Sequence, residues 1–176
     1  MPAENRPDVR NHRAPADMPD KIQVVEFLLG KEHYAIDLYD VKEVVDYTAI
    51  TRLPNTPAYI KGIMDLRGEI TTIIDLRERL SVAAEKNTGG DDNRRIIVLD
   101  EKLTGVKMGI IVDDVLSVST YDQSDVDRSS ASIYNDDAAI QGIIRKKVRV
   151  REKEVSDLVV WIGISRILRD AGCITP

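Results

Sequence analysis

Acidic side chains at the ends of aliphatic segments offer the first chemistry to consider in this chain. Asp75, Asp113 and Asp114 stand where two carboxylates could share general acid–base work. The alternative is that they cap the turns that follow, because an aspartate there accepts hydrogen bonds from free backbone N–H groups. We favour capping. A small carboxylate-dependent enzyme is the catalytic alternative that stays open.

Histidine and cysteine chemistry is almost absent. The chain has two histidines, His12 and His33, and one cysteine, Cys173, so a zinc site built from these residues and a Cys-His dyad are both excluded. No phosphate-binding glycine loop and no H-E-x-x-H motif occurs. The aspartates of residues 122–127 alternate loosely like calcium ligands, but the glycine and glutamate of a calcium loop are missing. We therefore expect no catalytic residue, no metal and no cofactor.

A basic run occupies residues 145–153. Its cations are Arg145, Lys146, Lys147, Arg149, Arg151 and Lys153. Val148 and Val150 alternate with them, a pattern that is typical of a half-exposed strand. Two interpretations stay open: contact with an acidic partner, or a solvated hairpin face balanced by the Asp-rich segment 122–137. Interleaved aromatics are absent, so stacking on nucleobases is not expected.

The composition limits the class of protein. The 176 residues carry 25 basic and 30 acidic side chains, for a net charge of −5, which argues against a nucleic-acid binder. Hydrophobic residues make up 43%, enough for a folded interior. No apolar run approaches the ~20 residues that cross a bilayer, and no secretory signal is recognisable. With a single cysteine, the sequence predicts a cytoplasmic protein without direct membrane insertion.

The order of elements is predicted to be mainly β. Residues 1–20 hold four of the seven prolines and predict a disordered tail before a folded domain at 21–172. Strands are expected at residues 22–29, 33–37, 60–66, 70–74, 95–99, 106–112, 115–121, 140–144 and 158–162. Helical segments are expected near 38–45, at 76–80 and at 164–171, where Gly172 stops the last one. Residues 81–93 and 122–137 are expected to be loops.

The two halves of the domain resemble each other. Residues 60–64 (IKGIM) match residues 140–144 (IQGII), and each segment is followed by an aliphatic strand and a short helix. A glycine inside a strand usually marks a bulge or tight bend. Five or six short strands per half, each half closed by a helix, indicate two small β-barrels that share one core.

Residues 50–80 carry the most specific pattern in the chain. They contain a Leu-Pro-Asn-Thr-Pro turn at 53–57, an Ile-Lys-Gly step at 60–62, an Asp-Leu-Arg-Gly tip at 65–68 and an Ile-Asp-Leu-Arg strand end at 74–77. This stretch closely resembles the signature of the CheW-like domain family, and the resemblance extends over roughly residues 21–170. Asp65 and Thr72 depart from the family pattern, and the stretch that contains the basic run is longer than in the family.

The resemblance implies a non-catalytic adaptor of chemotaxis built from two SH3-like five-stranded β-barrels around a shared hydrophobic core. Its implied partners are the regulatory domain of the histidine kinase CheA and the cytoplasmic tip of methyl-accepting chemotaxis receptors, which would associate the chain with membrane receptor arrays. The resemblance places Val41 and Glu43 in the receptor-binding region, and we expect the groove near them and Val112 to form the receptor surface. It places Lys61, Gly62 and Arg67 on the surface that affects kinase coupling.

Each implied role has a structural alternative. Gly62 serves a bend whatever the function, and Arg67 suits a solvated turn. Glu43 and Arg67 have opposite charges on the functional surface of the family, so we expect an ion pair between them. A CheW-like regulatory domain from a larger chemotaxis kinase or receiver-fusion protein is the alternative to a coupling adaptor.

Overall fold

The computed structural model describes residues 20–83, 93–129, 131, 133, 139–170 and 172. Its strands are β1 (Lys21–Leu29), β2 (Glu32–Asp37), β3 (Val41–Asp46), β4 (Ile60–Leu66), β5 (Glu69–Asp75), β6 (Arg95–Leu99), β7 (Met108–Val112), β8 (Asp114–Asp122), β9 (Val126–Asp127), β10 (Ile140–Val150) and β11 (Lys153–Ile162). The helices are α1 (Leu76–Leu80), α2 (Glu101–Thr104) and α3 (Ile164–Asp170), with 3-10 turns at Leu38–Asp40 and Gln123–Asp125. The expectations for the tail at 1–19, for residues 84–92 and for Cys173 lie outside the described residues.

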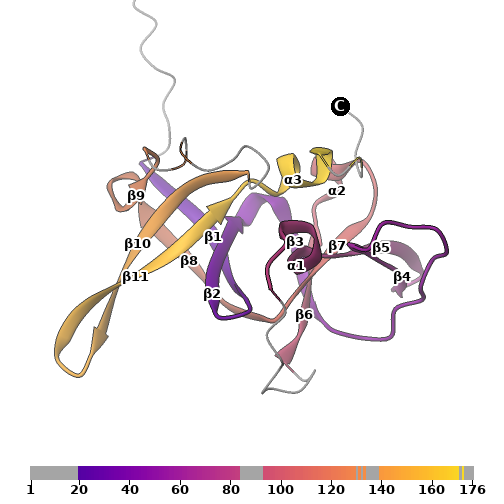
Figure 1. The fold of residues 1–176 in the computed structure, drawn as a ribbon, viewed down its shortest axis with the longest axis horizontal. Helices are drawn as coiled ribbons and strands as arrows, with labels where there is room; N and C mark the ends of the chain where they lie inside the picture. The colour runs from indigo at the N-terminus through magenta and orange to yellow at the C-terminus, as the bar shows by residue number, and fades with distance from the viewer. Residues whose placement is uncertain are drawn as a thin grey trace, which may run out of the picture.

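The strands form two sheets that lie side by side (Figure 1). Sheet A has the order β8-β1-β2-β11-β10-β9, and sheet B has the order β3-β6-β7-β5-β4. The mainly β architecture is confirmed. The expected five strands per unit hold for sheet B, whereas sheet A gains the two-residue strand β9 as a sixth.

The halves of the sequence are repeated, but they do not each build one sheet. Hairpin β1–β2 from the first half joins β8, β10 and β11 from the second half, while hairpin β6–β7 from the second half joins β3, β4 and β5 from the first. The positions of the strands correspond between the sheets: β11 pairs parallel with β2 in sheet A, as β5 pairs parallel with β7 in sheet B. Each half therefore contributes strands to both sheets.

One core joins the sheets. The largest cluster of buried side chains draws Phe27 and Ile36 from sheet A, Ile74 and Ile110 from sheet B, and Ile164 from α3. Two smaller clusters fill the separate interiors, one within sheet A around Trp161 and one within sheet B around Met64. Burying a side chain of this size contributes about 1.5–3 kcal/mol, so the shared cluster holds the two sheets together, and the expected shared core is confirmed.

Residues 38–45 differ from the expected helix. Only the 3-10 turn Leu38–Asp40 is helical, and β3 begins at Val41. β3 pairs antiparallel with β6, with Val44 opposite Ile97 and Val45 opposite Ile96. The helical spacing of Val41, Val44 and Val45 was misleading because these β-branched residues favour a strand once a partner strand is present.

Two further elements differ from expectation. The region 106–112 forms a strand only from Met108, and the preceding segment contains the helix α2, which begins at the N-cap Asp100. The last hairpin is much longer than expected: strands predicted at 140–144 and 158–162 continue to Val150 and back from Lys153. Residues 145–158, called the β10–β11 arm below, project from the body of the molecule (Figure 1).

In the described residues, no helix is long and apolar enough to span a membrane.

Candidate interaction surfaces

The ion pair between Glu43 and Arg67 is confirmed. Glu43 lies on β3, and Arg67 occupies the tip of the β4–β5 hairpin, where its φ of 54° is left-handed and Asp65 accepts a hydrogen bond from the Gly68 N–H at 2.6 Å. The guanidinium donates from Nη1 to Oε1 and from Nη2 to Oε2 of Glu43, both at 2.8 Å. This two-point contact fixes the direction of both side chains. Since 72% of the Arg67 side chain is exposed, the pair contributes only ~0–1 kcal/mol to stability.

More charge surrounds this pair. A small pocket beside it is lined by Lys42, Leu66, Thr71 and Val98 among others. Lys107, on its rim, forms ion pairs with Glu69 and, at 3.5 Å, with Glu101. The surface around Glu43 and Arg67 therefore presents fixed charges of both signs over a shallow floor.

The two valines assigned to the receptor-binding region lie against the core. Val41, at the start of β3, is half-buried and packs on the shared cluster. Val112, at the end of β7, is 1% exposed and belongs to that cluster. The structure thus gives Val112 a packing role, and a partner contact through its side chain would require the core to open.

Gly62 is required by the backbone around it. Its φ is +143°, and a Cβ there would lie 2.0 Å from the carbonyl oxygen of Thr51. The backbone at Thr51 lies directly against β4 here, because Thr51 and Ile63 exchange two backbone hydrogen bonds of 2.8 Å. The ladder between β4 and β5 shifts register between Ile60 and Gly62. This is the bulge that the sequence predicted, and the equivalent shift between Ile140 and Gly142 in β10 confirms the repeat.

Lys61 lies at the opposite end of β4 from Arg67. The seven residues of β4 rise by ~3.3 Å each, so the two cations are separated by about 20 Å along the strand. Lys61 instead approaches Asp75 at 3.5 Å and Glu78 at 3.7 Å. The sequence analysis assigned Lys61 and Arg67 to one surface, but the structure separates them. Arg67 lies beside Glu43, and Lys61 lies beside the start of α1.

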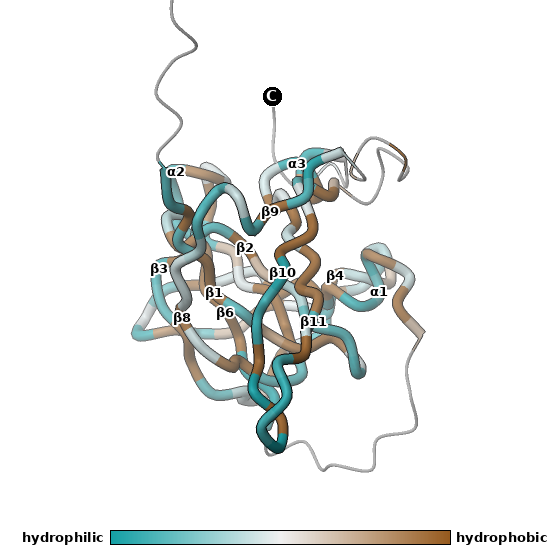
Figure 2. The backbone as a smooth tube through the Cα atoms, turned by 90° about the vertical axis from the view of Figure 1, so that its left-hand side faces the viewer, coloured by the Kyte–Doolittle hydropathy of each residue, from teal (hydrophilic) through white to brown (hydrophobic). Residues whose placement is uncertain are grey.

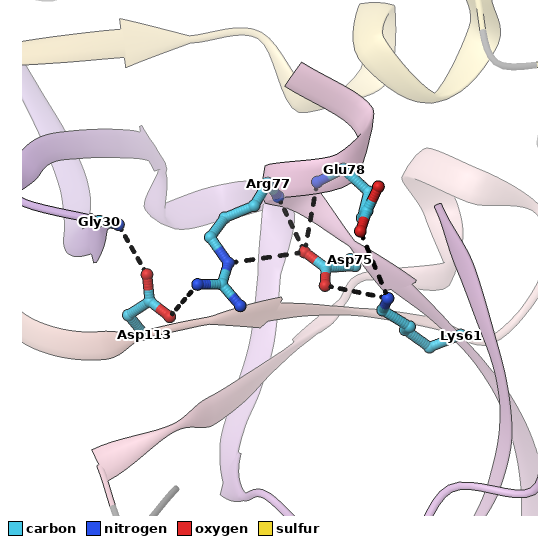
Figure 3. A network of polar contacts seen from close by, with 6 residues as sticks. All are labelled: Gly30, Lys61, Asp75, Arg77, Glu78 and Asp113. Atoms are coloured by element: carbon cyan, nitrogen blue, oxygen red, sulfur yellow. Dashed lines mark hydrogen bonds and ion pairs between the residues drawn. The ribbon is translucent and has the colours of Figure 1, made fainter. Parts of the chain in front are cut away.

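Around Lys61, a polar network connects the two sheets (Figure 3). Asp75 is the N-cap of α1, and its Oδ1 accepts hydrogen bonds from the backbone N–H groups of Arg77 and Glu78. Asp113 accepts a hydrogen bond from the Gly30 N–H at 2.6 Å and approaches Arg77 Nη1 at 3.3 Å. Both aspartates thus bind backbone N–H groups at turns, which confirms capping for Asp75 and makes Asp113 a link between β7 and the β1–β2 turn.

Sequence reasoning missed Arg77, which is 13% exposed and lies between these two carboxylates. Its place in a short helix, two residues after the strand-end Asp75, was the available signal. In the described residues, no group of three or more His, Cys, Asp or Glu side chains has the geometry to hold a metal ion.

Glu26 was also missed. It interrupts the apolar strand β1, is fully buried, and accepts hydrogen bonds from Lys146 Nζ at 2.7 Å and Tyr121 Oη at 2.5 Å. Burial alone would raise the pKa of Glu26, but the hydrogen bonds from these groups and Ser119, with the charge of Lys146, hold it below its ordinary value. A single charge inside an apolar run was the signal for a buried partner.

Comparison with known proteins decides the family. Residues 23–172 match the family model described as CheW-like domain. The chain belongs to the CheW-like domain family.

The relatives of this CheW-like chain include proteins named chemotaxis protein CheW. That of Treponema pallidum is 34% identical over 142 residues, which cover 80% of this chain and 83% of the relative. That of Bacillus subtilis is 30% identical over 129 residues, covering 73% and 80%. The crystal structure of the scaffolding protein TtCheW from Thermoanaerobacter tengcongensis matches with a TM-score of 0.64 and 32% identity, covering 81% of this chain and 88% of that chain.

Proposed function

We propose that this CheW-like chain is a non-catalytic adaptor that couples chemotaxis receptors to the histidine kinase CheA in the cytoplasm. The observation that carries the proposal is the family match over residues 23–172. Relatives named chemotaxis protein CheW and a neighbour named as a scaffolding protein support a chemotaxis coupling adaptor. They give no support to the alternative of a regulatory domain from a larger kinase.

The fold suits simultaneous binding of two partners. The two sheets share one core, which fixes the position of the outer surface of one sheet relative to that of the other. A standard interface takes about 800 Å² from each partner. Each contact is expected to be weak alone, and linkage within an array raises the effective affinity.

We assign the receptor contact to the surface around Val41, Glu43 and Arg67, and a kinase-coupling contact to the end of β4 at Lys61. Because Arg67 is bound to Glu43, it belongs with the receptor contact in this proposal. Gly62 acts by shaping β4 and not by touching a partner, since it is buried.

The test is charge reversal at Glu43. The variant Glu43→Arg is expected to reduce co-sedimentation with receptor-containing membranes at least tenfold, while binding to the CheA regulatory domain changes less than twofold. The matched control is Asp46→Arg, which breaks the exposed contact of Asp46 with Arg95 at 3.4 Å and should leave both bindings unchanged.

A double variant separates two roles of Glu43. If the ion pair acts by holding the β4–β5 tip against β3, Glu43→Arg combined with Arg67→Glu rebuilds the pair with its charges exchanged and restores part of the receptor binding. If Glu43 touches the receptor directly, the double variant stays as weak as the single one. Binding of neither partner, or competition of both for one site, would overturn the adaptor.

A further inference from the structure

The β10–β11 arm has a free strand edge. β9 pairs with β10 only at Ile143 and Ile144, and β10 continues for six more residues to Val150. Over those residues its only strand neighbour in the described part of the chain is β11, on the other side. A free edge offers backbone N–H and C=O groups to an extended segment of another protein.

Cations follow this edge at a spacing of two residues. Arg145, Lys147 and Arg149 are exposed and lie on one face of β10. The Cα atoms of neighbouring cations in this row are about 6.7 Å apart along the strand. Arg151 and Lys153 add two more exposed cations at the tip. Six of the 25 basic residues of a chain with net charge −5 thus lie within nine positions, and five of the six are exposed. In Figure 2, β10 is hydrophilic along most of the arm.

Among the described residues, one ion pair within 4 Å involves this row. Arg145 approaches Asp127 at 3.5 Å, which partly confirms the expected balance with the Asp-rich segment. Across the hairpin, Lys147 faces Ser156 and Arg149 faces Glu154. In the part of the chain that the structure describes, Lys147, Arg149 and Arg151 have no ion pair within 4 Å.

The base of the arm is held in place and bordered by a groove. Lys146 points to the other face and is bound to the buried Glu26. Beside it lies an open groove of about 570 Å³, with Arg145 and Lys147 on one wall and Thr120 and Asp122 of β8 on the other. The edge is therefore presented in a fixed direction, with room at its base for a bound chain to enter.

We propose that the outer edge of β10, from Arg145 to Val150, binds an extended acidic segment of a partner protein, which adds to it as a strand. Carboxylates at alternate positions of that segment repeat at the same ~6.7 Å as the cations and would form cross-strand charge pairs. A membrane is disfavoured, because the arm has no aromatic residue to anchor in the interface. Nucleic acid is disfavoured by the net charge of −5 and the same lack of aromatics.

The experiment measures binding of a fluorescein-labelled ten-residue peptide with Glu and Val alternating. Binding by the full chain is expected to weaken at least tenfold in the variant Lys147→Glu with Arg149→Glu. The matched control, Lys31→Glu with Lys102→Glu, reverses two exposed cations outside the arm and should change binding less than twofold. Hydrogen exchange at the backbone amides of residues 145–150 should slow when the peptide is bound, as strand addition requires.

Three results would overturn the proposal. The first is tighter binding of the arm to vesicles containing 30% phosphatidylserine or to a 20-nucleotide single-stranded DNA. The second is equal binding of a peptide with the same composition but its glutamates grouped at one end. The third is self-association of Lys147→Ser with Arg149→Ser without peptide binding by the native chain, because the cations would then only protect the edge from pairing.

Discussion

At the scale of single residues, Asp40 shows how neighbouring charge sets stability. It follows β2, in the 3-10 turn before β3, and its backbone carbonyl accepts a hydrogen bond from the Asp100 N–H at 2.9 Å. Burial, followed by repulsion from Asp37 and Asp100, raises the pKa of Asp40 from 3.8 to about 6. The charged form is therefore less stable in the folded chain than in the unfolded chain.

The sign of the pH dependence follows. Between about pH 4 and 6 the folded chain holds a proton at Asp40 that the unfolded chain has lost, so this group lowers the free energy of unfolding as the pH rises. We expect Asp40→Asn to stabilise the protein at pH 7.5 by roughly 1–3 kcal/mol and to flatten this slope. Urea denaturation from pH 4 to 8 measures it, with the exposed Asp46→Asn as control. An unchanged slope would contradict the prediction.

At the scale of elements, the bulge in β4 depends on one glycine. Gly62→Ala is expected to lower the free energy of unfolding by about 3 kcal/mol or more, because it combines an unfavourable φ of +143° with a contact of 2.0 Å to backbone. Thermal and urea denaturation measure the loss.

The control for that loss is Gly68→Ala in the next turn. Gly68 also has a positive φ, +83°, but a Cβ there meets nothing within 4 Å. The expected cost is only about 1–2 kcal/mol from the backbone conformation. If both variants lowered the free energy of unfolding equally, the close contact with the Thr51 backbone would not be what restricts Gly62.

The short helix α1 depends on its N-cap. Asp75→Ala removes the acceptor of two backbone N–H groups and is expected to cost about 1–2 kcal/mol. Asp75→Asn keeps an acceptor oxygen and loses only the charge near Lys61, at 3.5 Å, and Arg77, at 4.0 Å. Its cost should be less than half as large in urea denaturation. A loss as great as that of alanine would mean that the charge, and not the cap, holds this junction.

At the scale of the whole molecule, the ladders cross between the halves of the chain. β1 pairs with β8, β2 with β11, β3 with β6, and β5 with β7. Neither 20–83 nor 93–172 contains a complete sheet, so both sheets should lose structure in one transition.

This connectivity predicts complementation. If a protease site is placed between residues 84 and 92, the cut chain should stay together as a folded complex through these ladders and the shared core. The fragments 20–83 and 93–172 should be unfolded when expressed alone, and mixing them should restore the circular-dichroism spectrum of the intact chain. A fragment that unfolds cooperatively by itself would contradict this account.

The sequence by itself determined the local parts of this protein. The hairpins, the glycine bulges at Gly62 and Gly142, the helix at Leu76–Leu80 and the pair of Glu43 with Arg67 were all predictable. The first three depend on turn, bulge and capping preferences that act within a few residues. The ion pair depended on the specific pattern of residues 50–80 and its family resemblance.

Only the tertiary structure decided how those parts combine. Residues 41–46 became a strand because β6, far along the chain, pairs with them, and Val112 left the expected surface because both sheets enclose it. Lys61 was separated from Arg67 by the length of β4, and the exchange of hairpins between the halves could not be read from a repeat. Each outcome depends on contacts between segments that are distant in the sequence. The free energy of these contacts exceeds the local conformational preference, and the sequence of either segment alone does not reveal them.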